Sequence, residues 1–404
     1  MKERLDEWFG DSALLAAALG LSLVGVAMIW SAGQLDVPTA VTGIWLRQLL
    51  WLVIALFVFA VVTRIPLRIV EAASPILYGF SVLLLVLVLV RGSGPGASSW
   101  FRLGAASFQP AELAKLGTLL MLARTLSNRQ EAFTRLTSLW RPLIITVVPF
   151  GLVMLQPDLG SAITFGVILI AALFWAGVPL FTIFMLVSPG VSLMLGFSAA
   201  VWGAWIVLVV LLIYVRRPYL LEGVGIVMAN LLAGAAASPL WNQLAEYQQN
   251  RLLVFLDPGR DPRGAGWQLI QSQVAIGSGG VLGQGFGDGP QKRLSFLPEQ
   301  HTDFIFSVVG EELGFLGVLV LIGVFAWLLR RMISDASASS QEFGNILVFS
   351  LFAVWFAHLL INVGMTVGLM PVTGLPLPFL SYGGSFLLMT FVGLALTARV
   401  AIER

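Results

Sequence analysis

Residues 247–306 read YQQNRLLVFLDPGRDPRGAGWQLIQSQVAIGSGGVLGQGFGDGPQKRLSFLPEQHTDFIF, the longest polar segment of an otherwise apolar chain. Acidic, basic and histidine side chains gather in it: Asp257, Asp261, Asp288, Glu299, Asp303, Arg251, Arg260, Arg263, Lys292, Arg293 and His301. Seven glycines lie between Gly277 and Gly289. A loop this long, with no evident helical or strand period of its own, is usually functional or disordered. Its apolar residues and its abrupt end in an apolar run predict an ordered loop that folds back on the protein.

The composition defines the class of protein. The 404 residues are 58% hydrophobic and 11% charged, with a mean hydropathy of +0.92. No soluble domain can bury that much apolar surface, so the chain is predicted to cross a membrane many times. The net charge of +2 gives no reason to expect a nucleic-acid partner. Without cysteine and with two histidines, a divalent cation would have to bind carboxylates, which suits Mg²⁺ or Mn²⁺.

The apolar runs predict an all-α bundle of about twelve membrane spans in a single integral membrane domain, residues 1–404. Ten spans form a core, and an extra pair falls in 178–241. The expected spans are 13–32, 45–63, 73–91, 109–126, 142–156, 158–177, 180–198, 200–215, 222–241, 305–329, 345–368 and 381–400.

Basic residues predict the orientation, because cytoplasmic loops carry an excess of lysine and arginine. With both termini in the cytoplasm, the inner side collects Lys2, Arg4, Arg64, Arg68, Arg124, Arg129, Arg135, Arg141, Arg216, Arg217, Arg330, Arg331, Arg399 and Arg404. The long loop 242–304 then lies outside the cytoplasm, and an even number of spans is required.

Glu112 and Lys115 are charged residues inside a predicted span. They are three residues apart on one helix, so they share a face and can pair. Charges at this depth normally face a cavity or a partner. The pair is therefore either a structural link between helices or part of a substrate site, together with Trp100 and Arg102 just before the span.

Asp158 follows Gln156-Pro157 at the start of another span, much as Glu112 follows Gln109-Pro110. Proline in the first helical turn costs no hydrogen bond, and an acidic group there is favoured by the helix dipole. Asp158 is either an ordinary charge at a helix start or part of a shaped turn near the outer interface.

Asp303 lies where the long loop enters the next span, two residues after His301. Thr302 or Asp303 could cap the helix that begins near Phe304. The alternative is that Asp303 is a general base, poised by partial loss of its hydration.

The glycine-rich run AIGSGGVLGQGFGDGPQ could bring backbone N–H groups to a phosphate, or it could be a flexible linker. No P-loop and no G-x-G-x-x-G pattern is present, so nucleotide binding is unsupported. Gln291 ends this run. Lys292 and Arg293 follow directly, and they either neutralise a pyrophosphate or are solvated loop charges.

Residues 371–386, PVTGLPLPFLSYGGSF, predict a rigid non-helical segment, which membrane depth tolerates only inside protein or beside a cavity. Ser381 and Tyr382 would offer hydroxyl groups to such a cavity. His358 and Asn362, four residues apart in a late predicted helix, are expected to make hydrogen bonds to other helices rather than to form a site.

Five motifs in this order resemble the SEDS family of RodA, FtsW and SpoVE: FQPAELAKL, LQPDLGSA, GAGWQLIQSQVAIGSGG, FLPEQHTDFIF and PLPFLSYGGS. The resemblance covers residues 30–399, and the loop motifs resemble the RodA branch more than the FtsW branch. It implies a peptidoglycan glycosyltransferase for cell elongation and shape. Such enzymes polymerise lipid II on the outer face of the bacterial cytoplasmic membrane, beside a class B penicillin-binding protein.

The resemblance also implies roles for individual residues. Asp303 corresponds to the essential carboxylate of the family, and Asp158 to the acid of its QPDLG motif. The membrane-embedded pair corresponds to Glu112 and Lys115. Trp100 and Arg102 correspond to its aromatic-x-Arg position. The other supporting candidates, selected from the residues themselves, are Gln291, Lys292, His301, Ser381 and Tyr382. Pro290 stands where the family usually has threonine, so no hydroxyl role carries over there.

The residues and the resemblance together predict an inverting displacement. Asp303 deprotonates the acceptor's 4-hydroxyl, which attacks C1 of the lipid-linked glycan, and undecaprenyl pyrophosphate leaves. A divalent cation or basic loop residues would neutralise that leaving group. Two other functions are compatible with the sequence: a lipid II flippase, and a non-catalytic scaffold for the penicillin-binding protein.

Overall fold

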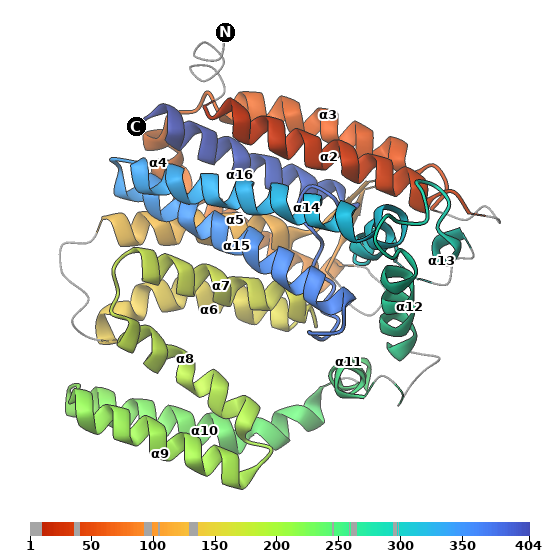
Figure 1. Ribbon diagram of the computed structural model, residues 1–404. Helices are drawn as coiled ribbons and strands as arrows, with labels where there is room; N and C mark the ends of the chain where they lie inside the picture. Colours follow the sequence, from red (N-terminus) through yellow and green to blue (C-terminus); the bar gives the residue numbers. More distant parts are fainter. Residues whose placement is uncertain are drawn as a thin grey trace.

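The computed structural model describes residues 10–35, 41–92, 99–103, 106–128, 136–244, 246–257, 259, 265–293, 297 and 299–404. These residues form a helical bundle with one small hairpin (Figure 1). The helices are α2 Ser12–Ala32, α3 Ile44–Val62, α4 Leu67–Arg91, α5 Pro110–Ser127, α6 Trp140–Met154, α7 Leu159–Trp175, α8 Leu180–Leu195, α9 Ala199–Arg216, α10 Leu220–Gln243, α11 Glu246–Leu256, α12 Ala265–Ser278, α13 Pro290–Arg293, α14 Ile305–Ala338, α15 Glu342–Thr366 and α16 Gly384–Ile402. A 3₁₀ turn, η1 Leu136–Leu139, precedes α6.

The prediction of a polytopic helical membrane protein is confirmed, and each of the twelve expected spans coincides with a helix. Within the described residues, nine helices are long and apolar enough to cross a membrane. α7 and α8 are apolar but shorter, and α5 falls outside the nine. The 18-residue α5 carries Glu112, Lys115 and Arg124, which explains its lower apolar character. One feature departs from an all-α fold: antiparallel strands β1 Phe101–Leu103 and β2 Ala106–Phe108 join α4 to α5.

The beginning of α2, the end of α14 and the C-terminus meet at one end of the bundle (Figure 1). Arg331 pairs with Asp11, the N-cap of α2, and Arg404 pairs with Asp335. The Glu403 carboxylate accepts a 3.0 Å hydrogen bond from the backbone of Leu67, so α4 also begins here. α14 runs from the opposite end, so the residues just before Ile305 lie there.

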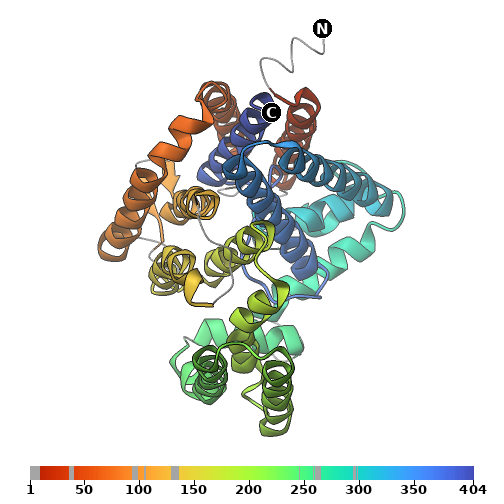
Figure 2. The same ribbon diagram turned by 90° about the vertical axis from the view of Figure 1, so that its left-hand side faces the viewer.

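α8, α9 and α10 form a separate group beside the main bundle (Figures 1 and 2). The buried Asn230 joins them: its side-chain oxygen accepts from Ser192 at 2.7 Å and from Trp205 at 3.2 Å, and its amide donates to Ser188 at 2.8 Å. Region 178–241 thus forms three helices around a polar centre.

The loop 242–304 has more regular structure than its sequence suggested. α11 and α12 are helices of 11 and 14 residues, so the expectation of no internal helical period is wrong. α12 packs on α14 and α15. The expected folding back of the loop onto the membrane bundle agrees with this packing in the described residues.

The glycine-rich turns after α12 dock into a kink of α14. Gly314 interrupts α14 with φ 63° and ψ −167°. Backbone hydrogen bonds across the kink replace those that the helix loses: Gln284 to Glu311 at 2.9 Å, Gly285 to Glu312 at 3.2 Å, Phe315 to Gly280 at 2.9 Å and Leu316 to Val281 at 3.1 Å. Because non-helical backbone at this depth must find internal partners, the loop and the kink stabilise each other.

Candidate active site

Asp303 lies one residue before the N-cap of α14, and a hydrogen bond to its own backbone carbonyl holds it in place. Its carbonyl oxygen accepts a 2.9 Å hydrogen bond from the Asn362 side-chain amide on α15. The Asn362 amide also donates to the Leu375 carbonyl at 2.8 Å, so one side chain fixes Asp303 to the segment after α15. Gly374, with φ 75°, passes close to the Asp303 carboxylate. A side chain at Gly374 would be strained by this φ, and its Cβ would be in van der Waals contact with that carboxylate.

The Asp303 carboxyl is poised to exchange a proton near neutral pH. Burial raises its pKa from 3.8 to about 6, and the charges of Glu299 and Asp158 act in the same direction, while Arg251 opposes them. Among the described residues no group donates a hydrogen bond to this carboxylate. It is therefore free to accept a proton from a bound hydroxyl group.

The helix-capping interpretation of this motif is wrong. α14 has Phe304 as its N-cap and makes no side-chain capping bond. The Thr302 hydroxyl donates instead to the Glu299 carboxylate at 3.0 Å. Burial lowers the pKa of His301, with Glu299 opposing, so the imidazole is neutral at pH 7. His301 Nδ1 is buried and has no partner in the described structure, and its ring lies 5.6 Å from that of Tyr382.

Asp158 is both a charge at a helix start and part of a shaped turn, the two roles that the sequence left open. It caps α7 by accepting a 3.0 Å hydrogen bond from the Ser161 backbone, and its other oxygen accepts from the Gln109 side chain at 2.9 Å. The two Gln-Pro motifs of the sequence thus meet in space. Gly160 brings α7 against the Thr373 carbonyl, which leaves no room for a Cβ atom.

Glu112 and Lys115 form the predicted ion pair, with Lys115 Nζ 2.7 Å from Glu112 Oε1. Both side chains are nearly buried, at 6% and 7% exposure. Lys115 also lies over the Phe386 ring at 5.8 Å, on which His358 stacks at 5.2 Å. The pair therefore joins α5 to α15 and α16 near the end of the bundle that carries Asp303, and this position is compatible with both of its expected roles.

Ser381 is not exposed to a cavity, in contrast to the prediction. It is 1% exposed, donates to the Thr302 carbonyl at 2.7 Å and accepts from Leu377 at 2.8 Å. The Tyr382 backbone donates to the His301 carbonyl at 2.9 Å, and the Tyr382 side chain is half-buried. The segment after α15 is therefore bonded directly to His301 and Thr302. Ser381 positions the His301–Asp303 segment through its bond to Thr302.

His358 and Asn362 both lie on α15, and each forms hydrogen bonds to residues outside that helix. His358 Nδ1 lies 2.9 Å from the Pro376 carbonyl oxygen, while Asn362 binds Asp303 and Leu375. Residues without regular backbone bonds need such side-chain partners when buried. Both residues therefore hold the segment that encloses the candidate base.

The structure also corrects the expectation that Lys292 and the glycine-rich run bind a phosphate group. Lys292 is 1% exposed and pairs with Glu312 and the Ser31 hydroxyl, so it is not placed to bind a pyrophosphate. The Gln291 backbone donates to the Glu311 carboxylate at 2.8 Å. Gln291 and Lys292 therefore both attach the loop to α14. The N–H groups of Gln284 and Gly285 bind α14 carbonyls rather than facing a phosphate site.

Trp100 and Arg102 precede α5 in the hairpin. Trp100 is half-buried, and Arg102 pairs through its backbone with Ser107. The Arg102 side chain lies outside the described residues.

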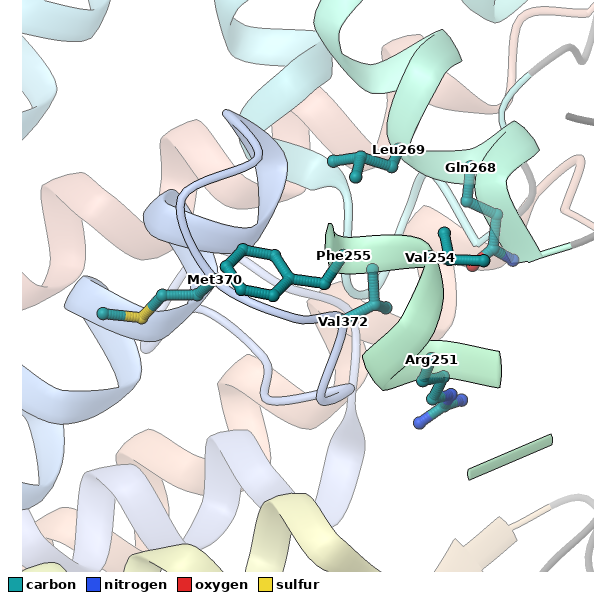
Figure 3. Close-up of a pocket in the computed structure, with 7 residues that line it drawn as sticks. All are labelled: Arg251, Val254, Phe255, Gln268, Leu269, Met370 and Val372. Carbon is teal, nitrogen blue, oxygen red and sulfur yellow. The ribbon is translucent and has the colours of Figure 1, made fainter. Parts of the chain in front are cut away.

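Two charged residues that act on Asp303, Arg251 on α11 and Glu299, were not among the site candidates chosen from the sequence. α11 lies beside α12 and the segment after α15, with a small cavity of about 40 Å³ between them (Figure 3). The cavity is lined by Arg251, Val254, Phe255, Gln268, Leu269, Met370 and Val372. Figure 3 shows the Phe255 ring directed toward Met370. Arg251 is exposed on α11, and its charge acts on Asp303 from there.

A site for a divalent cation would have to include the substrate. The described residues contain no group of three or more acidic or histidine side chains arranged to hold a metal. Mg²⁺ commonly binds through one or two carboxylates together with substrate phosphates and water. Asp303 and Asp158, which influence each other electrostatically, are the carboxylates that fit this description.

The fold and the site define a multi-spanning helical membrane protein with a desolvated, unpaired carboxylate at one end of the bundle. Residues 12–404 match the family model described as cell cycle protein, FtsW/RodA/SpoVE. The chain therefore belongs to this family, the SEDS family that the motifs indicated.

Several relatives are similar over nearly their full length. The peptidoglycan glycosyltransferase MrdB of Escherichia coli K12 is 34% identical, over 98% of this chain and 94% of its own. The peptidoglycan glycosyltransferase RodA of Treponema pallidum is 33% identical, over 93% and 94%. A solved chain from a peptidoglycan synthase complex that coordinates polymerization and crosslinking has a TM-score of 0.72 and 31% identity, over 97% of both chains. Rod shape determining protein RodA of Thermus thermophilus has a TM-score of 0.63 and 28% identity, over 97% and 96%.

Proposed function

We propose that this protein is a peptidoglycan glycosyltransferase that polymerises lipid II into β-1,4-linked glycan strands for cell elongation and shape. The observation that carries the proposal is the Asp303 carboxyl, whose pKa is raised to about 6 and whose oxygens accept no hydrogen bond from the described residues. A carboxylate of this kind suits general-base catalysis, since it ionises near neutral pH and remains basic. The names of the relatives support the same reaction class.

The reaction is a single displacement. Asp303 removes the proton of the acceptor sugar's 4-hydroxyl, and the oxygen bonds to C1 of the lipid-linked glycan. The bond from C1 to the pyrophosphate breaks, and undecaprenyl pyrophosphate leaves with the electron pair. The configuration at C1 inverts, so no second carboxylate is needed as a nucleophile, by analogy with inverting glycosidases.

A divalent cation, Mg²⁺ or Mn²⁺, would supply charge neutralisation for the leaving pyrophosphate. Asp158 would hold it together with the pyrophosphate oxygens and water, which leaves the Asp303 carboxylate free to act as the base. Arg251 acts electrostatically on Asp303, and it would assist the same neutralisation. Lys292 is not assigned to this role, because Glu312 already pairs with it.

The protein is proposed to work in the bacterial cytoplasmic membrane, with both termini in the cytoplasm and Asp303 at the outer face. The basic residues at the end that carries Arg331 and Arg404 support this orientation. The proposed partner is a class B penicillin-binding protein, supported by the similarity to a chain of a synthase complex.

The test is glycan polymerisation from purified lipid II with Mg²⁺ and the cognate class B penicillin-binding protein. Wild-type protein is expected to produce long strands. Asp303→Asn should lower the rate at least about 100-fold, because the general base is lost. Asp288→Asn removes an exposed carboxylate of the same loop and should leave the rate unchanged. Full polymerisation by Asp303→Asn would refute the assignment of the base.

A further inference from the structure

A second cavity, of about 720 Å³, opens at the end of the bundle opposite Asp303, between α4, α5 and α6. The residues with polar groups that line it are Arg68, Glu71, Arg124, Thr125, Asn128, Trp140 and Arg141. Gln109, next to the candidate active site, and Arg124 lie at opposite ends of α5. At 1.5 Å per residue they are about 22 Å apart, so the cavity is distinct from that site.

Hydrogen bonds within the wall fix part of this cavity. Arg124 Nη1 donates to the carbonyl oxygens of Glu71 at 2.8 Å and Ala72 at 3.0 Å. The Asn128 amide donates to the Glu71 carboxylate at 2.6 Å. Among the described residues, Arg124 Nε and Nη2 donate to no protein acceptor. The guanidinium is thus held in place with donors left over for a ligand.

The charge of the cavity favours an anion. The cavity lining contains three arginines and one glutamate, Glu71, so its net charge is positive. Glu71 already accepts a hydrogen bond from Asn128. Arg68 and Arg141 are exposed, and the Arg141 guanidinium lies over the Trp140 ring at 5.2 Å. Guanidinium groups bind phosphate oxygens through paired N–H donors.

The rest of the lining is apolar, which a site for a free anion would not need. Met121, Ile144 and Ile145 line the cavity beside the arginines. The exposed apolar face of α6 continues from it one turn further, through Val147 and Val148. Trp140 is 55% exposed at the start of this face. Tryptophan with arginine at the end of membrane helices is typical of the headgroup level of a bilayer.

We propose that this cavity binds an anionic glycerophospholipid. The arginines bind the phosphodiester, Trp140 lies at the headgroup level, and an acyl chain follows the apolar face of α6. Basic pockets between membrane helices on the cytoplasmic side are suited to anionic lipid headgroups. The other source of the same chemistry, a soluble phosphate ester, would use the arginines but not the apolar face.

The test is native mass spectrometry of the full chain in detergent, titrated with dioleoylphosphatidylglycerol or dioleoylphosphatidylcholine. These lipids share acyl chains and differ in net charge. The wild-type protein is expected to bind the anionic lipid more tightly. Arg68→Gln with Arg141→Gln should weaken that binding about 25-fold, roughly fivefold per arginine, and leave phosphatidylcholine binding unchanged. Both arginines are exposed, so the variant should unfold at the same temperature as wild type.

Two further variants separate a built site from general attraction. Arg68→Lys with Arg141→Lys keeps the charges and should retain most of the affinity. Arg217→Gln with Arg330→Gln removes two exposed arginines from other helices and should change nothing. Equal weakening in both glutamine double variants, or no preference for the anionic lipid in wild type, would refute the site. Displacement of the lipid by millimolar glycerol 3-phosphate would refute its assignment to a lipid.

Discussion

The Gln109 side-chain amide donates a 2.9 Å hydrogen bond to the Asp158 carboxylate, which joins the starts of α5 and α7. α5 carries the Glu112–Lys115 pair, and Asp158 acts electrostatically on Asp303. One contact between residues 49 positions apart therefore relates four of the candidate site's charged groups.

The Gln109–Asp158 contact predicts coupling between the two residues. A neutral donor bonded to a carboxylate contributes about 1.5–3 kcal/mol. A double-mutant cycle of Gln109→Leu and Asp158→Asn, measured by denaturant unfolding in detergent, should give a coupling energy of about 1–3 kcal/mol. Gln48→Leu combined with Asp158→Asn serves as the control, since Gln48 binds Ser381 and Gly383. That pair should be additive within about 0.5 kcal/mol, and an equally large coupling there would contradict the prediction.

The pKa of Asp303 predicts how polymerisation depends on pH. A base with a pKa of about 6 is protonated below that value, so the rate should fall about tenfold per pH unit in acid. The measurement is the rate of lipid II polymerisation between pH 5 and 8, with the penicillin-binding protein present. A rate that stayed level down to pH 5 would mean that another group is the base.

The same carboxyl should make the protein less stable when it ionises. Its pKa is about 6 in the folded protein and 3.8 when unperturbed, so the folded state holds the proton more tightly. Stability from this group is fully present below about pH 4 and is lost as the pH rises through 6. Asp303→Asn should therefore raise the free energy of unfolding by up to about 3 kcal/mol at pH 7.5 and by little at pH 4.

This stability change is measured by unfolding wild type and Asp303→Asn at both pH values. Asp288→Asn, on the exposed side of the same loop, should show no such difference between the two pH values. If Asp303→Asn were less stable than wild type at pH 7.5, the carboxylate would be satisfied rather than strained.

The buried Lys292–Glu312 pair predicts an asymmetric mutational response. Lys292→Met leaves the Glu312 charge buried and unpaired and should destabilise the protein by about 3–5 kcal/mol. Lys292→Met with Glu312→Leu removes both charges and should recover most of that loss. Arg330→Met, at an exposed position on the same helix as Glu312, is the control and should have little effect. A double variant as unstable as the single one would show that the two side chains act independently.

Two nearby glycines predict opposite responses to alanine. A Cβ at Gly279 would overlap the Gly310 carbonyl, whereas one at Gly277 meets nothing within 4 Å. Gly279→Ala should separate the glycine-rich turns from α14 and impair both stability and polymerisation. Gly277→Ala, inside α12, should stabilise by up to about 1 kcal/mol through helix propensity. Thermal unfolding of both variants checks this, and matching losses at the two positions would contradict the docking arrangement.

The sequence by itself predicted the helical membrane class, the positions of the twelve helices and the family. Those properties are local, because span length and apolar content are set by bilayer thickness, and motifs are read along the chain. The Glu112–Lys115 pair was also predictable, since residues three apart on a helix share a face.

Tertiary structure alone decided which polar groups are already bonded. Lys292, Ser381 and the glycine-rich run were expected to meet a ligand, but α2, α14 and the backbone of Thr302 and Leu377 provide their partners. Asp303 was equally compatible with a helix cap, yet it remains unpaired among the described residues. The physical reason is that a buried polar group binds whichever partner the fold brings within about 3 Å, and such partners are often distant in sequence.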